Sequence, residues 1–177
     1  MAMTLITTNT SSNAASSSFT SSIDSTYKLY IFKFYDINPA TDSSNFQVNF
    51  STDGGSNYNA TKTTTVFKSN LYEDGSGGAL GYSTGDDLAQ STDFQPLTSA
   101  NGNGADESCA GELHLFNPAS TTYVKHFYAR LNIYVYVDMS RELYTAGYVN
   151  STDNVDAVQF KMSSGNMDGV IKMWGVK

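Results

Sequence analysis

Apolar and polar residues alternate along several stretches of this chain with the two-residue period of a β-strand. In the longest of them, residues 125–137, Leu131 and Ile133 belong to an apolar face, whereas Arg130 and Asn132 belong to a polar face. The other strand-like stretches are residues 27–37, 46–51, 58–67, 109–116, 144–148, 158–162 and 170–176. No stretch has a convincing helical period, so the pattern predicts roughly eight to ten strands and no helix.

Residues that favour turns separate the strand-like stretches. Asn38-Pro39 ends the first of them, and two glycine-rich segments, residues 73–91 and 101–104, predict long loops. Short strands between turns, without an internal repeat, are typical of an antiparallel β-sandwich or jelly roll, and this all-β fold is our prediction. The residues that we expect in its core include Leu29, Ile31, Phe46, Val48, Leu113, Leu115, Leu131, Ile133, Phe160 and Ile171.

The first 22 residues differ from the rest of the chain. Of these, 14 are Ser, Thr or Asn, and the segment lacks the basic and apolar regions of a signal peptide. The chain therefore divides into an extended N-terminal arm, residues 1–22, and one domain, residues 23–177. Such an arm is ordered only when its own sheet or a neighbouring subunit holds it. We expect it to lie along a neighbouring protein as an added strand, with Leu5, Ile6 and Phe19 as apolar anchors.

The composition is that of a folded domain whose polar surface is rich in uncharged residues. The 177 residues are enough for a sizeable core, and 40% of them are hydrophobic and 13% aromatic. Charged residues make up 15%, compared with about a quarter in typical proteins. The single cysteine, Cys109, excludes an internal disulfide, so the fold must rely on its core.

The net charge of −7 limits the expected partners. An acidic chain repels a phosphate backbone, which argues against nucleic acid. No segment approaches the roughly 18 apolar residues of a membrane span, so we expect a soluble protein made in a cytoplasm. Acidic residues fall mainly in the predicted loops, where they favour solubility or, alternatively, calcium binding. These residues are Asp42, Asp53, Glu73, Asp74, Asp86, Asp87, Asp106, Glu107 and Asp153.

The residue types that carry catalysis are few and scattered. His114 and His126 lie on different predicted strands without the spacing of a metal site, and we interpret both as surface or interface residues. Cys109 alternates with small residues as a core side chain does. The carboxylate pairs Asp86-Asp87 and Asp106-Glu107 lie in polar segments with nothing apolar to raise a pKa. We therefore expect no catalytic residue, no metal ligand and no cofactor, and hence no enzyme.

Tyrosines are concentrated in and after the longest predicted strand. Tyr128, Tyr134 and Tyr136 share its polar face, and Tyr144 and Tyr148 follow closely. One interpretation is that these rings pack in the core of a second sheet. The other is that they form a subunit interface or a sugar-stacking surface, where an amphipathic ring is favoured.

Three segments, residues 19–34, 113–122 and 158–177, resemble a group of small structural proteins of tailed bacteriophages that infect marine bacteria, including cyanophages. The last segment carries the most specific motif, which in the group resembles Ser-Gly-Asn-hydrophobic-Asp-Ser-Gly-Thr-Ile-Lys-hydrophobic-Tyr-Gly. This chain departs from the motif in a shorter loop around Gly169 and in Trp174, which replaces the usual tyrosine. The departures affect local loop geometry more than the fold.

The resemblance implies a jelly-roll-like virion protein on the surface of a phage head or tail, and it transfers no active-site residue. We expect a capsid decoration, or cement, protein that clamps neighbouring major capsid subunits. The alternative is a receptor-binding or tail-fibre module that recognises a polysaccharide of the host surface, and a small polysaccharide-degrading enzyme is a third possibility. We further expect a homotrimer with the major capsid protein or tail proteins as partners.

Overall fold

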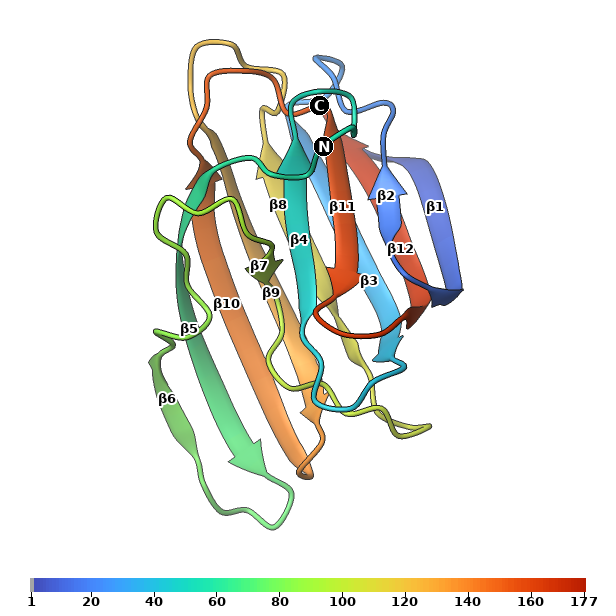
Figure 1. The fold of residues 1–177 in the computed structure, drawn as a ribbon, viewed down its shortest axis with the longest axis vertical. Helices are drawn as coiled ribbons and strands as arrows, with labels where there is room; N and C mark the ends of the chain where they lie inside the picture. Colours follow the sequence, from blue (N-terminus) through green and yellow to red (C-terminus); the bar gives the residue numbers. More distant parts are fainter. Residues whose placement is uncertain (1) are drawn as a thin grey trace.

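The computed structural model describes residues 2–177, and their strands form two antiparallel sheets that face each other (Figure 1). The strands are β1 (Met3–Ala14), β2 (Ser17–Phe19), β3 (Leu29–Pro39), β4 (Phe46–Ser51), β5 (Lys62–Tyr72), β6 (Ala79–Tyr82), β7 (Gln95–Pro96), β8 (Cys109–Phe116), β9 (Lys125–Val135), β10 (Met139–Val149), β11 (Ala157–Met162) and β12 (Met167–Val176). The predicted all-β sandwich is confirmed. Among the described residues, no helix is long and apolar enough to cross a membrane.

The two sheets are unequal in size. The larger sheet has eight strands in the order β1-β12-β3-β8-β9-β10-β5-β6, and the smaller has four in the order β2-β11-β4-β7. The pairs β3·β12, β4·β11 and β5·β10 are nested within one another and alternate between the sheets, as in a jelly roll. The innermost pair, β8·β9, then joins the larger sheet between β3 and β10 instead of completing the smaller one.

Aromatic rings from both sheets meet at the centre of the sandwich. The ring of Phe160 on β11 lies 5.1 Å from that of Phe34 and 5.3 Å from that of Phe32, both on β3 in the opposite sheet, measured between ring centroids. Phe46 of β4 stacks on Phe160 at 5.7 Å, and Phe19 of β2 meets it edge-on at 6.2 Å. All five side chains are at most 3% exposed. Such ring pairs stabilise a core beyond the burial of their area.

The predicted core is correct except on β3. Nine of the ten residues expected to be buried are buried, and Leu29 is the half-buried exception. On β3 the side chains of Tyr30, Phe32 and Phe34 face the smaller sheet, whereas Ile31 faces outward and is buried between its strand neighbours. Because β3 is apolar on both faces, alternation could not define which face points inward.

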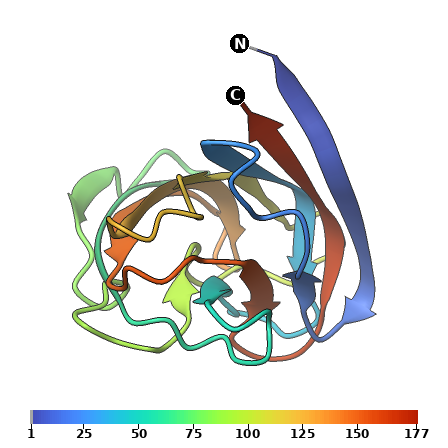
Figure 2. The same ribbon diagram turned by 90° about the horizontal axis from the view of Figure 1, so that it is seen from above.

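The N-terminal segment is part of the sandwich, so the chain's own sheets hold it and it is not a separate arm. β1 pairs with β12 at the edge of the larger sheet, and β2 pairs with β11 at the edge of the smaller one (Figure 2). Phe19 is a core residue and cannot anchor another subunit, and Ile6 packs against the same core. Of the three predicted anchors, Leu5 alone is largely exposed. Threonine and isoleucine suit a strand, and β12 offers β1 an edge that the composition of the segment did not reveal.

Two lysines are buried where strands meet loops. Lys62 Nζ donates hydrogen bonds to the carbonyl oxygens of Ala60 and Asp93 at 3.0 and 2.6 Å, and Lys125 Nζ donates to the carbonyl oxygen of Ser151 at 3.0 Å. Burial lowers the pKa of Lys62 to about 8, against the opposing effect of the Asp93 charge. Burial likewise lowers the pKa of Lys125. The cost of desolvating an ammonium group is only partly offset by such bonds.

Leu131→Ala and Ile133→Ala should each lower the free energy of unfolding by roughly 2–5 kcal/mol, because each leaves a cavity in a packed core. Both side chains are at most 1% exposed. The matched control is Asn132→Ala, which changes the exposed residue between them and should cost less than about 1 kcal/mol. Urea denaturation measures all three. Wild-type stability in both core variants would show that this face of β9 does not carry the core.

Replacing Lys62 with Met should change how stability depends on pH. The folded protein releases the Lys62 proton above a pKa of about 8, whereas the unfolded chain keeps it up to about 10.5. The unfolded state therefore binds more protons in this window, and the stability of the wild type rises relative to Lys62→Met as pH increases from 8 to 10.5. The gain is at most about 3.5 kcal/mol, from roughly 1.4 kcal/mol per pKa unit.

Urea denaturation of both proteins across this window measures the difference, in which the titration of tyrosines and of Cys109 cancels. A difference that stays constant with pH would contradict a depressed pKa at Lys62.

Candidate binding surface

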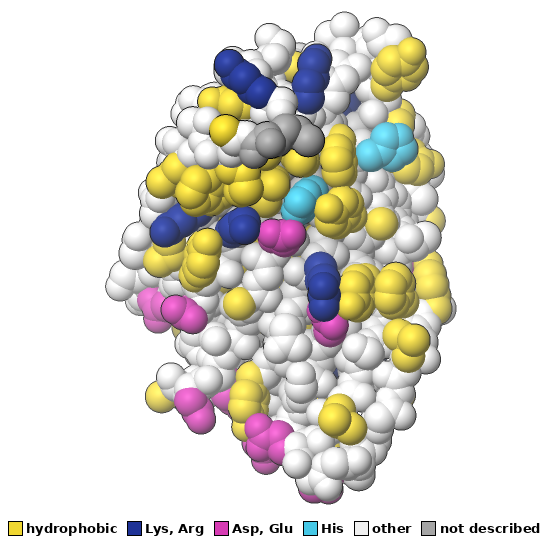
Figure 3. Space-filling view, turned by 180° about the vertical axis from the view of Figure 1, so that it is seen from behind, with side chains coloured by type: hydrophobic (Ala, Val, Ile, Leu, Met, Phe, Trp, Pro, Cys, Tyr) yellow, Lys and Arg dark blue, Asp and Glu magenta, His cyan; other side chains and the backbone are white. Residues whose placement is uncertain are grey.

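Outward-facing side chains of the larger sheet form rows across its strands, because strand partners in register lie side by side. The row that starts at the β1 edge consists of Leu5, Trp174, Ile31, His114, Tyr128, Ala146 and Thr65. Apolar side chains gather in a band across the upper half of this face (Figure 3). We call the following residues the outer band: Leu5, Trp174, His114, Phe116, Tyr128, His126 and Tyr148.

The centre of the outer band is a cluster of three rings on β8 and β9. The His114 ring stacks on Tyr128 with centroids 4.6 Å apart and an interplanar angle of 18°, and Phe116 lies 5.7 Å from Tyr128. The Tyr128 hydroxyl is 3.1 Å from His114 Nδ1, and His114 Nε2 is 2.8 Å from a carboxylate oxygen of Glu112. Phe116 and Tyr128 remain 37% and 42% exposed, so part of each ring is available to a ligand.

A second cluster lies beside the band on the same face. Phe67 of β5 and Tyr144 of β10 are strand partners whose rings stack at 4.6 Å, only 8° from parallel. The Arg130 guanidinium lies 5.3 Å from the centre of the Tyr144 ring and forms an ion pair with Glu142. Phe67 is 45% exposed. Arg130 thus makes a cation–π contact with Tyr144 while Glu142 neutralises its charge.

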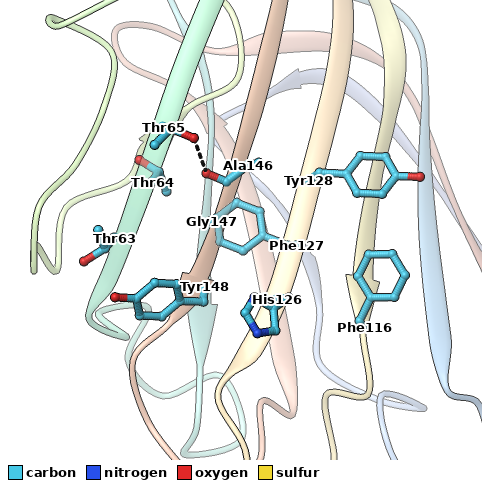
Figure 4. A pocket seen from close by; sticks show the side chains of 10 residues that line it. All are labelled: Thr63, Thr64, Thr65, Phe116, His126, Phe127, Tyr128, Ala146, Gly147 and Tyr148. Atoms are coloured by element: carbon cyan, nitrogen blue, oxygen red, sulfur yellow. Dashed lines mark hydrogen bonds between the residues drawn. The ribbon is translucent and has the colours of Figure 1, made fainter.

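The surface is hollowed where β10 carries small residues. A hollow of about 380 Å³ has His126, Phe116, Tyr128 and Tyr148 among its walls, with Ala146 beside them (Figure 4). A second hollow of about 290 Å³ shares Tyr128 and Ala146 with the first and continues towards the second cluster. We call these two adjoining hollows, which both have aromatic walls, the groove. No carboxylate is among the residues that line either hollow.

The structure brings together three of the five predicted tyrosines. Tyr128, Tyr144 and Tyr148 face outward on neighbouring strands, which excludes packing in the core of the sandwich. Tyr134 lies further along β9, and hydrogen bonding to Glu73 raises its pKa to about 12. Tyr136 is exposed in the turn between β9 and β10.

Several residues of this surface were missed by the sequence analysis. Phe116 lies two residues after His114 on β8, and Phe67 lies two residues after Thr65 in a threonine-rich stretch. The two-residue period therefore places each pair on one face. What the pattern could not supply is the strand order, which sets β8, β9, β10 and β5 side by side. The two histidines lie on the surface face, as predicted, although Tyr128 covers most of His114.

The groups considered for catalysis or for calcium binding have roles in the fold. Burial raises the pKa of the Cys109 thiol to about 12, so the thiol stays protonated at neutral pH. Hydrogen bonds from Asn57 and Ser51 lower the pKa of Asp53 to about 2 and occupy its carboxylate in a turn. Within residues 2–177, no three His, Cys, Asp or Glu side chains gather where they could hold a metal ion.

Comparisons of the chain with protein-family models, with curated proteins and with solved structures find no match. The exposed rings of this surface offer broad apolar contact, and its charged residues are paired across strands, as in Lys33 with Glu112 at 3.7 Å. Such a surface is suited to binding a partner.

Proposed function

We propose that this protein is a structural protein of a bacteriophage particle, a capsid decoration protein that attaches to neighbouring subunits through the outer band. The observation that carries the proposal is the exposure of large apolar side chains together on one sheet face, since monomeric proteins rarely leave such patches open. The resemblance of three segments to virion proteins of tailed phages supports the class of particle.

The chemistry of the face suits burial against a protein. Phe116 and Tyr128 offer large, rigid contact area, and aromatic side chains of this kind contribute most to binding at interfaces. The nearby charges already have partners, because Glu112 contacts both Lys33 and His114. Covering the face therefore leaves few charges unpaired, which limits the desolvation penalty.

The double variant Phe116→Ser/Tyr128→Ser should bind poorly to phage heads that lack their own copy of the protein. We expect a loss of at least about 2 kcal/mol in binding free energy, since aromatic residues at the centre of an interface contribute this much or more. Cosedimentation with purified heads measures it, and circular dichroism checks the fold.

The matched control is Phe94→Ser, because Phe94 packs against Lys161 of the smaller sheet on the other side of the molecule. Heads that the double variant coats as well as the wild type does would refute attachment through the outer band.

A second candidate, a module that recognises a host surface polysaccharide, is favoured by the groove beside Ala146. The C–H groups of a sugar ring carry partial positive charge and are attracted to the negative face of an aromatic ring. Tyr128 and Tyr148 supply such faces, and the volume of about 380 Å³ is in the usual range for a small ligand. The hydroxyl of Thr65, which donates to the carbonyl oxygen of Ala146, adds a polar group to the lining.

If the groove binds glycan, an array of bacterial surface polysaccharides should contain at least one that binds the wild type and binds Tyr148→Ala at least about tenfold more weakly. Tyr148 belongs to the outer band and lies against His126 at 6.0 Å, but it is not part of the Phe116–Tyr128 cluster, so this variant changes the groove and leaves that cluster intact. Phe94→Ala serves as the control. An array without any bound polysaccharide, or equal binding by Tyr148→Ala, would exclude this candidate.

A further inference from the structure

Three of the four sheet edges are protected against pairing with another chain. The smaller sheet ends in β2 and β7, of three and two residues, and Pro96 removes a donor from β7. At the far edge of the larger sheet, the outermost strand β6 has only four residues and covers one half of β5. The segment 83–91 covers the other half through backbone hydrogen bonds, including those between Lys62 and Ser91 at 2.9 and 3.1 Å.

The fourth edge, β1, has little of this protection. β1 has 12 residues, about twice the common strand length, and it forms the outer rim of the sandwich (Figure 2). Its sequence contains neither proline nor a charged residue. Bulges interrupt its pairing near Ile6 and near Asn13, but residues 7–11 form a regular stretch between them. Within residues 2–177, no backbone hydrogen bond from another element reaches the free side of this stretch.

From this contrast we infer that β1 is an assembly edge, at which a second copy of this chain pairs antiparallel with the same residues. Two chains of net charge −7 repel each other, so a stable contact requires a surface without like charges. The uncharged residues 3–14 provide it. A strand edge is self-complementary about a two-fold axis, because its free N–H and C=O groups match those of an inverted copy. This inference does not depend on the proposed function.

The pairing has a defined geometry. A two-fold axis perpendicular to the sheet joins the two larger sheets into one continuous sheet and places both outer bands on the same side. The exposed side chains of Thr8 and Thr10 then lie beside those of the second copy, and the exposed Met3 and Leu5 gain contacts beyond the regular stretch. The product is a dimer, and it differs from the homotrimer predicted from the sequence.

Sedimentation equilibrium of the wild-type protein should give twice the mass of the 19.2-kDa chain. The double variant Thr8→Lys/Thr10→Lys brings like charges together at the edge and should weaken association by at least about tenfold. The control, Thr121→Lys/Thr122→Lys, adds the same charge at exposed positions in the turn between β8 and β9 and should leave the dimer intact.

Hydrogen exchange gives a second measurement that needs no variant. Amides of residues 7–11 on the free side of β1 should become protected as protein concentration rises. A monomeric or trimeric wild-type mass, a dimer that survives the lysines at positions 8 and 10, or exchange at residues 7–11 that is independent of concentration would each overturn the inference.

Discussion

The packing of Phe160 against rings from both sheets sets the position of one sheet on the other. Its contacts with Phe32 and Phe34 reach across the sandwich, while Phe46 and Phe19 extend the cluster along the smaller sheet. The smaller sheet has only two strands of six residues, β4 and β11, so it covers only part of an eight-stranded partner. Beneath β5 the smaller sheet contributes only the two-residue strand β7, which contains Gln95, and the segment before it completes the cover. Loops carry polar backbone that needs partners, which explains the buried bonds from Thr64 to Gln95 and from Gln95 to the carbonyl oxygen of Asp86.

The difference in size between the two sheets also explains the position of the candidate surface. A sandwich buries the inner face of each sheet and leaves the outer faces to solvent, and an eight-stranded sheet has a wide outer face. Here the rings of Tyr128 and Phe116 pack with His114 and with each other, and this packing covers only part of their surface. Self-packing of this kind fixes ring orientation before any partner arrives, and preorganised side chains lose less entropy on binding.

The sequence predicted those parts of the structure that depend on local alternation. On β9 the inward residues Leu131 and Ile133 were identified because the opposite face is polar, whereas on β3 the same reasoning chose Leu29 over Tyr30 because both faces are apolar. Pairing between distant segments could not be predicted, since nothing in residues 3–14 indicates a partner near the other end of the chain. Nor did the alternation reveal that Lys62 is buried at the start of β5, because its ammonium group needs the carbonyl oxygen of Asp93, about 30 residues away, as well as that of Ala60.

Leu5 connects the two surfaces for which we propose roles. It stands at the end of the row that contains Tyr128, and it also belongs to the free edge strand. In a two-fold pair, both outer bands face one side of a continuous sheet, so a single flat partner can contact both. Linked contacts raise apparent affinity by making the second binding event intramolecular. In the decoration role that we propose, a dimer would then attach more firmly to a repetitive array than to isolated subunits. A decoration protein requires this difference in affinity between the array and the isolated subunits. If it attached to subunits before assembly, it would obstruct the contacts that those subunits make in the particle.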